Sequence, residues 1–474
     1  MKRIYIYVLF ILVGIGTACS NFDNINTDQE ATNKVTSPMI ATRIILNLTK
    51  QPTQKGFLQP YMLNKNIVWT EFVESYQYNG FGSVSLSFTS INDAHFMPKF
   101  ATSEKLAKSY EGLMYFARAV KFFEATMDLG DIPYHDALKG EEEKLYFPKY
   151  DTQKEVLLGI LRELELADNA FSEGDQFEGD PIYGGNIQKW RQLVNSYTLH
   201  VLLQVSKKES DIDLNIKDRF QKIVTNKPVF TSNSDSYQLT HADKNGQQYP
   251  FYKVGNSFTI YPILSSEVVD RLKDRRDRRV FYYAHPSPVR LKNGSTQSDF
   301  EAYVGIDPSL IYDNILDIKN TNDYSRLNNR YTEIATGEPT QKLAYAQFCF
   351  IIAEAAVRGW VNESALDWCQ KGTRASMEFI YANTPNDIQY HHGMPLDKAY
   401  VDNYVSAMTL PAGVEKQLEE VVTQKYLASF LHSSFNTYYD YRRTGYPKWK
   451  INEASSLNSE APTKVPVRWR YSAN

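Results

Sequence analysis

Apolar residues recur every three or four positions over long stretches of this chain, which is the spacing of a buried helix face. One such stretch runs from Leu106 to Leu129 and stops at Gly130, a residue type that commonly follows a helix. Thr152 and Glu155 have the spacing of a capping box in front of another stretch. Helices are therefore predicted over about 37–50, 106–129, from 152 onward, 187–205, 345–358 and 414–432.

Two of these helices carry additional signals. Ser37 before Pro38 matches a capping residue followed by proline at the first helical position. Residues 345–358 are apolar nearly all round and include alanines that let neighbouring helices approach closely, so a central buried helix is predicted there. Helix pairs at this spacing suit a tetratricopeptide-like stack, in which each pair buries its face against the next.

The helical period fails between about 225 and 340, where Gly, Pro, Asn, Asp and Tyr gather in short runs. We therefore expect a mainly α fold with one body over 37–474. Its tetratricopeptide-like helical-repeat scaffold would occupy about 37–225 and 340–450. The segment between them is expected to be a loop-rich insert that contains short β-hairpins.

The start of the chain indicates export. Two basic residues precede an apolar run over 4–15, and small residues lead into Cys19. The run is too short for a membrane-spanning helix, which needs roughly 20 mostly apolar residues. We predict a lipoprotein signal peptide over 1–18, lipidation of Cys19 and a flexible polar tether over 19–36, with ordinary signal cleavage nearby as the alternative.

Charge and cysteine content narrow the possible partners. The formal net charge is −3, and it becomes −5 once the signal peptide with its two basic residues is removed, so the chain is a poor polyanion binder. The arginine-rich segment 270–280 is interleaved with aspartates, and we predict no nucleic-acid binding. Three cysteines, one of them Cys19, do not make a disulfide scaffold.

Catalytic and metal-binding motifs are missing from the sequence. There is no Gly-x-Ser-x-Gly elbow, no Walker-type phosphate loop and no His-Glu-x-x-His, and the eight histidines are scattered. Asp211 and Asp213 begin like a calcium loop, but Ile216 stands where that loop needs glycine and Lys222 where it needs glutamate. We expect no enzymatic activity, no cofactor and no metal.

Several segments together resemble one known family. They are GDIPYHDAL (130–138), KWRQLVNSYTLHVLLQVS (189–206), YAQFCFIIAEAAVRGW (345–360) and QKYLASFLHSSFNTYYDYRRTGYPKW (424–449). In these segments the chain is similar to the SusD/RagB family of outer-membrane lipoproteins, and particularly to its second SusD-like branch. RRDRRVFYY (275–283) departs from the family's Asp-Pro-Arg element, because Arg278 replaces the proline.

The resemblance implies a function as well as a fold. A member of this family sits at the cell surface, anchored by lipid in the outer membrane, over a TonB-dependent (SusC-like) transporter. It captures oligosaccharides, or peptides in some branches, and hands them to the transporter without breaking bonds.

Aromatic residues make up 14% of the chain, and rings of this kind stack on the C–H faces of sugars as well as packing cores. The segment 69–83 loses its helical pattern, and such loops on a rigid scaffold favour binding. The alternative is that Trp69 and Phe72, three residues apart, belong to the core. The predicted glycan-binding residues are Trp69, Tyr76, Tyr78 and Phe81 in this segment and Tyr249, Phe251 and Tyr252 in the irregular middle region.

Three functions from different classes therefore remain open. The first is a glycan-capturing surface lipoprotein, which needs aromatic platforms and polar groups that read hydroxyls. The second is a peptide-capturing member of the same family, which needs pockets for side chains and termini. The third is a helical-repeat adaptor of an envelope complex, which needs an extended protein-binding surface and no small ligand.

Overall fold

The structure, a computed structural model, describes residues 34–141 and 143–472. The predictions for Cys19, for the signal peptide over 1–18 and for most of the tether over 19–36 lie outside these residues. Within the described part, no helix combines the length and the apolar character that crossing a membrane requires.

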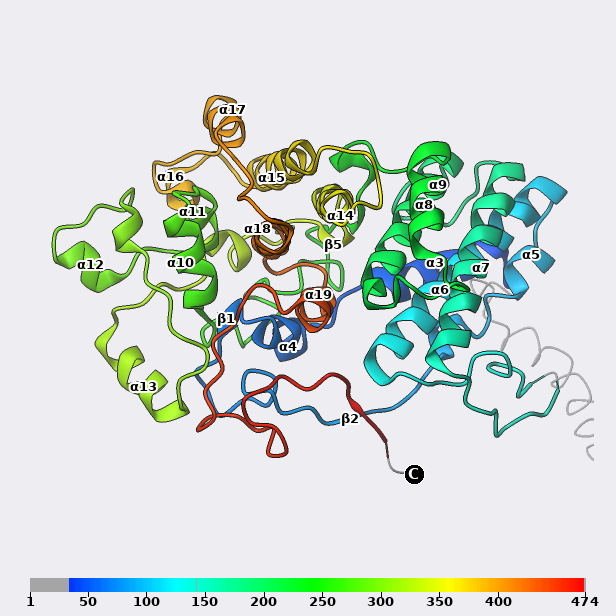
Figure 1. Cartoon of the computed structure of the whole chain (residues 1–474), viewed down its shortest axis with the longest axis horizontal. Coiled ribbons are helices and arrows are strands. Elements are labelled where there is room, and N and C mark those ends of the chain that lie inside the picture. Colours follow the sequence, from blue (N-terminus) through cyan, green and yellow to red (C-terminus); the bar gives the residue numbers. More distant parts are fainter. Residues whose placement is uncertain (1–33, 142, 473–474) are drawn as a thin grey trace, which may run out of the picture.

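The first half of the chain forms one helical side of the molecule (Figure 1). α6 (Glu104–Leu129) and α7 (Gln153–Glu173) pack along much of their lengths, and α8 (Ile187–Gln204) packs against α7. The other helices of this side are α3 (Ser37–Thr49), α5 (Phe96–Lys99) and α9 (Ile216–Asn226). α4 (Lys55–Leu63) also belongs to this half of the sequence, but it lies near the middle of the molecule, below α18 (Val414–Ala428) in Figure 1.

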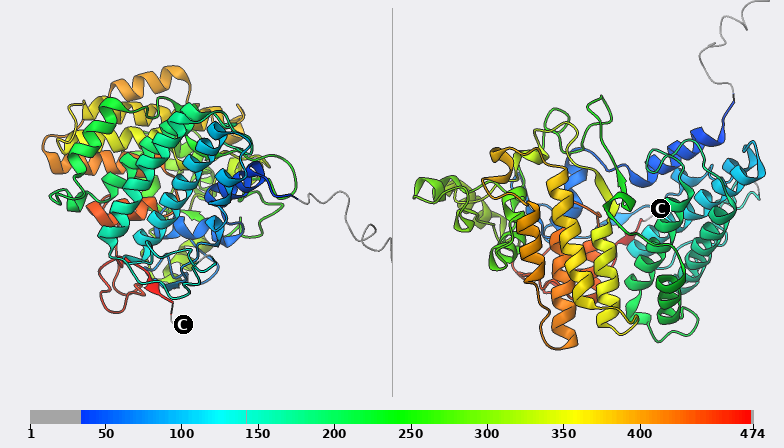
Figure 2. Two further views of the ribbon diagram at one scale, coloured as in Figure 1. Left: turned by 90° about the vertical axis from the view of Figure 1, so that its right-hand side faces the viewer. Right: turned by 90° about the horizontal axis from the view of Figure 1, so that it is seen from above.

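The second half of the chain forms the other helical side. α14 (Tyr345–Val357) packs against α15 (Ala365–Ala382) and α18 (Val414–Ala428), and Figure 2 shows these helices side by side from above. The remaining helices are α10 (Ser266–Asp274), α11 (Arg279–Tyr283), α12 (Pro288–Lys292), α13 (Tyr312–Thr321), α16 (Ile388–His391), α17 (Lys398–Ser406) and α19 (Asn436–Thr444).

The prediction of a mainly α, tetratricopeptide-like scaffold is confirmed, and local signals set its helix ends. The Thr152 hydroxyl accepts a hydrogen bond from Glu155 N, and the Glu155 carboxylate accepts one from Thr152 N at 2.8 Å, so the capping box forms. α6 ends at Gly130, whose φ of 93° suits glycine. Ser37 is the first residue of α3 rather than its cap, because its hydroxyl donates to Met97 O at 2.8 Å.

The strands are short and pair across long distances in sequence. β1 (Ile67–Val68) pairs antiparallel with β4 (Ile263–Leu264), β2 (Ser83–Val84) pairs parallel with β6 (Arg470–Tyr471), and β3 (Tyr237–Leu239) pairs antiparallel with β5 (Thr340–Leu343). None of these pairs in the described residues is a hairpin, so that detail of the expected insert is wrong. An isolated two-stranded hairpin is at best marginally stable, and these strands pair instead with segments already held by the body.

The middle of the chain, expected to be loop-rich, also contains α10 to α13. α10 forms because Val268, Val269 and Leu272 bury one face of it and the Ser265 hydroxyl caps its start by accepting from Glu267 N. The irregular part that remains, around 239–261, lies beside the end of α3 and the start of α4. This irregular segment is carried by a large continuous core that includes residues from both helical sides.

Candidate functional site

A cavity of about 600 Å³ opens between the C-terminal end of α3 and the loop over 239–255. Its volume lies within the range of small-molecule sites. α3 and the following residues supply Leu46, Lys50, Gln51 and Thr53, the chain near α8 supplies Pro181, and the loop supplies Leu239, Thr240, His241, Ala242, Asn245, Gly246, Gln247, Gln248, Tyr249, Pro250, Tyr252 and Gly255.

Most polar groups in this lining are uncharged amides and hydroxyls. Lys50 is the one lysine or arginine among the described lining residues, and no aspartate or glutamate is among them. The loop keeps its shape through backbone hydrogen bonds: Ala242 N donates to Gln247 O at 2.9 Å, and Gln247 N donates to Lys244 O at 2.9 Å. A surface of this kind can exchange hydrogen bonds with neutral hydroxyl groups.

Tyr249 and His241 are two lining residues whose rings pack against each other. Their ring centroids lie 5.6 Å apart with an interplanar angle of 78°, and Tyr249 N donates to Ala335 O at 2.8 Å. The Tyr249 hydroxyl and His241 Nε2 are buried and have no hydrogen-bond partner among the described residues. Burial lowers the pKa of His241 to about 4, so the imidazole is neutral at pH 7. Neither atom is accessible from the cavity in this structure, so the Tyr249 and His241 rings contribute to the lining mainly by packing.

The second predicted set of aromatic residues divides in two. Tyr249 and Tyr252 line the cavity, and Tyr252 is partly exposed. Phe251 between them is fully buried and stacks on Phe57 of α4 with centroids 5.9 Å apart. Tyr249 is 2% exposed and also contacts Phe57, with ring centroids 5.7 Å apart. Phe251 and Tyr249 therefore anchor the loop, while Tyr252 faces the cavity.

In the first predicted set, Tyr76 and Phe81 lie in an aromatic cluster with the C-terminal segment. Phe81 stacks on Trp469 with centroids 4.5 Å apart, and Tyr76 contacts the rings of Phe435 and Trp469. Tyr78 is 3% exposed and packs in a separate small cluster of buried residues. These three rings hold segment 69–83 against the body.

Trp69 is fully buried, whereas Phe72 is 42% exposed. The Trp69 ring contacts Phe72, Phe258 and Tyr261, and its backbone N donates to Gln77 Oε1 at 2.6 Å. The core alternative therefore describes the position of Trp69 but not that of Phe72. The sequence gave only a weak indication that these rings meet, since Phe258 and Tyr261 are aromatic residues in the irregular middle region.

Comparison with known proteins identifies the family to which this chain and its fold belong. Residues 24–472 match the model of the second SusD-like branch, described as starch-binding and associating with the outer membrane. The chain belongs to the SusD-like family. No curated protein sequence matches it significantly.

Solved SusD-like structures are similar over nearly the whole chain. A SusD homolog from Bacteroides fragilis is 41% identical with a TM-score of 0.89, and the match covers 92% of this chain and 93% of that chain. A second SusD homolog from Bacteroides fragilis is 30% identical with a TM-score of 0.80, covering 93% and 92%. A chitin-binding SusD homolog from Flavobacterium johnsoniae is 18% identical with a TM-score of 0.67, covering 90% and 89%, and shows the fold alone.

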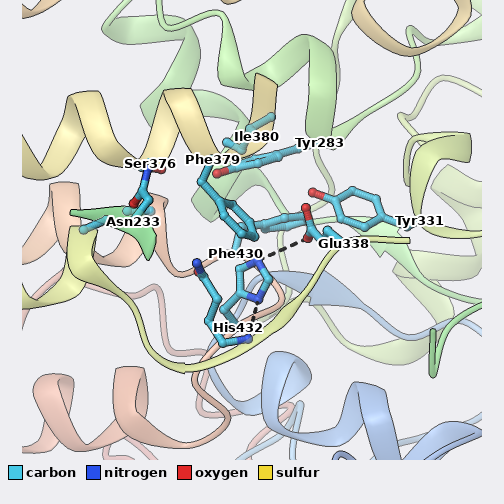
Figure 3. Close-up of a pocket in the computed structure, with 12 residues that line it drawn as sticks. Asn233, Tyr283, Tyr331, Glu338, Ser376, Phe379, Ile380, Phe430 and His432 are labelled. Carbon is cyan, nitrogen blue, oxygen red and sulfur yellow. Dashed lines mark hydrogen bonds and ion pairs between the residues drawn. The ribbon is translucent and has the colours of Figure 1, made fainter. Parts of the chain in front are cut away.

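A second cavity in this SusD-like chain belongs to the packed interior (Figure 3). Its volume is about 10 Å³, which is close to the space for one water molecule. Glu338 lies at its edge and pairs with His432 Nε2 at 3.1 Å and with Arg330 Nη2 at 2.5 Å. These two partners hold the pKa of Glu338 at about 2, although burial opposes them. The group is a buried ion pair in the core, with no room for a sugar.

The grouping of histidine, cysteine and carboxylate side chains bears on metal binding and on nucleophilic chemistry. Among residues 34–141 and 143–472, no three histidine, cysteine, aspartate or glutamate side chains are grouped so as to hold a metal ion. Cys349 and Cys369 are both buried as free thiols, and burial raises the pKa of each to about 12, so neither is a ready nucleophile.

Proposed function

We propose that this SusD-like protein is a cell-surface glycan-binding lipoprotein that captures oligosaccharides in the 239–255 cavity. It would deliver them to a partner TonB-dependent (SusC-like) outer-membrane transporter without breaking bonds. In this proposal residues 1–18 are removed as a signal peptide, Cys19 carries the lipid, residues 19–36 act as the tether and the body begins at 37. The protein would then lie on the outer membrane and face the exterior.

The observation that carries the proposal is the chemistry of the cavity lining. The partly exposed Tyr252 offers aromatic surface, while Gln51, Gln247 and Gln248 offer amides that donate and accept hydrogen bonds. Sugars present C–H faces and hydroxyls, which these two kinds of group match. The family description of starch binding and outer-membrane association supports the same function.

The same lining disfavours peptide capture. Peptide termini and many side chains carry charge, and burying a charge is favourable where an opposite charge meets it. Lys50 is the one lysine or arginine among the described lining residues, and they include no carboxylate. A neutral ligand is therefore the better match.

Isothermal titration calorimetry of the purified protein with starch, chitin and other plant, fungal and host glycans tests the proposal. A proteolytic digest serves as the peptide arm. We expect one glycan class to bind and Tyr252→Ala to weaken that binding by roughly tenfold through loss of aromatic contact. Tyr381→Ala, which changes a 42% exposed tyrosine on α15 outside the cavity lining, is the matched control.

Two results would count against the proposal. Binding of peptides and of no glycan would favour the peptide-capturing alternative. Release of shortened sugars from the bound glycan during long incubation, followed by chromatography, would contradict capture without cleavage.

A further inference from the structure

The chain between α6 and α7 carries exposed aromatic side chains that are not part of the cavity lining. Tyr146, Phe147 and Tyr150 are 66%, 91% and 56% exposed. This part of the chain projects from the lower edge of the molecule in Figure 1. Neighbouring aromatic residues that are this accessible form an apolar surface of the kind that marks an interaction site.

Hydrogen bonds at its base hold this segment out from the body. Ile132 N donates to Asp151 O at 3.2 Å, and Asp151 N donates to Ile132 O at 3.0 Å. The Asp151 carboxylate also accepts from Tyr134 N at 2.8 Å. The Tyr150 ring contacts the Tyr471 ring, with centroids 5.6 Å apart. Both ends of the projecting segment are thus fixed, so a partner that binds between them has less chain to order.

Residues 144–150, which we call the 144–150 loop, have the sequence KLYFPKY. The loop consists of two lysines and five apolar or aromatic residues, and it has no amide or carboxylate side chain that could recognise sugar hydroxyls. Aromatic rings are enriched at the level of lipid headgroups, and lysine side chains there cover apolar surface with their stems while the ammonium groups stay in water. The composition of the loop therefore matches a lipid interface better than a sugar.

Charge should add little to such a contact. Asp136 and Glu143 pair with Lys139 at 3.1 and 3.8 Å. Over residues 139–150 the three lysines and three glutamates cancel in formal charge. Apolar contact would therefore supply most of the binding, and anionic lipids would be preferred only weakly.

The small size of the loop favours a fluid surface over a protein partner. A stable protein–protein interface uses about 20–30 residues on each side. The 144–150 loop offers seven residues. A lipid interface needs no complementary shape, so a few exposed rings are enough to enter it.

The start of the body lies within reach of the same bilayer. The Ser37 hydroxyl donates to Met97 O, so the body begins beside α5, which precedes α6, whereas the 144–150 loop follows the end of α6. α6 has 26 residues and is therefore about 39 Å long. Residues 19–33 span at most about 50 Å of extended chain, which exceeds the length of α6. A lipid on Cys19 and the loop can therefore meet one bilayer.

We propose that the 144–150 loop is a membrane-contact site that inserts the Phe147 ring and the tyrosines beside it among lipid headgroups. This inference rests on the lipid anchoring in the proposed function and adds a second contact between the protein and the bilayer. A tethered loop meets the bilayer at an effective concentration of about millimolar, so a weak contact is sufficient. The contact limits how the body can tilt on its tether.

Fluorescence of the full lipidated chain tests this in vesicles of phosphatidylcholine, with and without phosphatidylglycerol. Phe147→Cys receives an environment-sensitive dye, and Cys349 and Cys369 are buried, so the dye is directed to the new thiol. We expect its emission to move to shorter wavelength in both kinds of vesicle and to be quenched by spin-labelled lipids. Tyr381→Cys, at an exposed position on α15, is the matched control and should emit as in water.

A form that begins at residue 20 tests the loop without the lipid, and it retains every residue that the structure describes. It should sediment weakly with the same vesicles. Phe147→Ala should reduce that binding roughly tenfold, because the side chain that enters the interface is lost. Tyr381→Ala should leave the binding unchanged.

The possible failures are distinguishable. If the full chain binds vesicles and the dye at position 147 still emits as in water, the membrane contact is wrong while the proposed function stands. The same holds if the shift in emission requires a second membrane protein, or if Phe147→Ala weakens glycan binding instead. If mass spectrometry finds no lipid on Cys19, the anchoring in the proposed function fails, and sedimentation of the shorter form still decides whether the loop binds lipid.

Discussion

Gly337 and Gly246 both adopt left-handed backbone near the cavity, yet they differ in what surrounds them. Their φ angles are 48° and 76°, a region that glycine enters freely and other residues do not. A Cβ atom added to Gly337 would lie 2.3 Å from Cγ of Tyr249, whereas one added to Gly246 would have nothing within 4 Å. The close approach of the 337 backbone is thus what lets the Tyr249 ring sit at the cavity.

We therefore expect Gly337→Ala to be more damaging than Gly246→Ala. Both changes impose left-handed strain of about 1–2 kcal/mol. The Gly337 change adds an overlap with a buried ring, and overpacking of this kind costs about 1–3 kcal/mol. Urea denaturation of both variants measures the difference, and glycan titration should show weaker binding for Gly337→Ala because Tyr249 has to move. Equal losses of stability in the two variants would show that the Tyr249 ring can move away from the added Cβ atom at no cost in free energy.

The sequence predicted some of the residues that line the cavity, but it did not predict the exposure of every side chain. Tyr249 and Tyr252 were identified because aromatic residues in an irregular segment have few local partners. The exposure of Phe72 could not be predicted, since the partners that bury Trp69 beside it, Phe258 and Tyr261, are far along the chain. Residue type gives the chemistry a side chain can perform, but its direction depends on contacts that only the folded chain makes.

At the scale of elements, buried charges connect four helices. Arg443 of α19 donates to Glu354 of α14, with one of the two contacts at 2.8 Å, and to Asp440 at 2.9 Å. Asp440 also pairs with Lys425 of α18 at 2.8 Å and accepts from Gln204 of α8 at 2.9 Å. All these side chains are at most 7% exposed. Each charge is therefore paired with an opposite charge on another helix.

Removing one member of this network should be costly. Arg443→Met leaves the Glu354 carboxylate buried without its main partner, and we expect a loss of about 3–5 kcal/mol in the free energy of unfolding. Combining it with Glu354→Leu should recover much of that loss, because the uncompensated charge is gone. Arg374→Met, which breaks a pair with Asp402 at the surface, should cost less than about 1 kcal/mol.

Denaturant unfolding of the two single variants and the double variant forms a thermodynamic cycle. A double variant as unstable as the sum of the single changes would mean that Glu354 and Arg443 do not depend on each other. The cycle would then contradict the view that this pair joins α14 to α19.

The helices and strands also differ in how well they could be predicted from the sequence. α6, α7 and α14 were predicted because the spacing of their apolar residues and the residues that mark their ends are both local features of the sequence. Short strands were expected in the middle region, but their pairing was not predicted, since β2 pairs with β6 and β3 with β5, and no short-range pattern specifies such partners. α10 to α13 were missed because short helices between Gly- and Asp-rich turns leave too few periods to recognise.

At the scale of the whole molecule, buried histidines should govern the response to acid. Burial lowers the pKa of His200 to about 3 and the pKa values of His241 and His392 to about 4, and it lowers the pKa of His285 as well. The unfolded chain takes up protons on these imidazoles near pH 6.5. Between pH 6.5 and about 4 the unfolded state therefore binds more protons than the folded state, and stability falls as the pH falls.

Carboxyl groups with lowered or raised pKa values also affect how stability changes between pH 6.5 and about 4. Glu338 and Asp440 have pKa values of about 2 in the fold, so the stability they contribute is lost only below about pH 4. Asp128 acts in the opposite direction, because burial raises its pKa to about 7 and the folded state then gains a proton on acidification. Burial also raises the pKa values of Glu163 and Asp270. Three carboxyls of this kind oppose four imidazoles, so the net change should still be destabilising.

We expect the thermal unfolding midpoint to decline steadily from pH 6.5 to pH 4, as followed by circular dichroism in buffers of equal ionic strength. His200→Phe provides the discriminating variant. The His200 ring packs against Phe123 and Tyr197, and its Nδ1 has no hydrogen-bond partner among the described residues, so an apolar ring of similar size suits the position. This variant should show a shallower decline because one buried proton acceptor is missing. A midpoint that stays constant down to pH 4, or an equal slope in the variant, would mean that these imidazoles do not control acid stability.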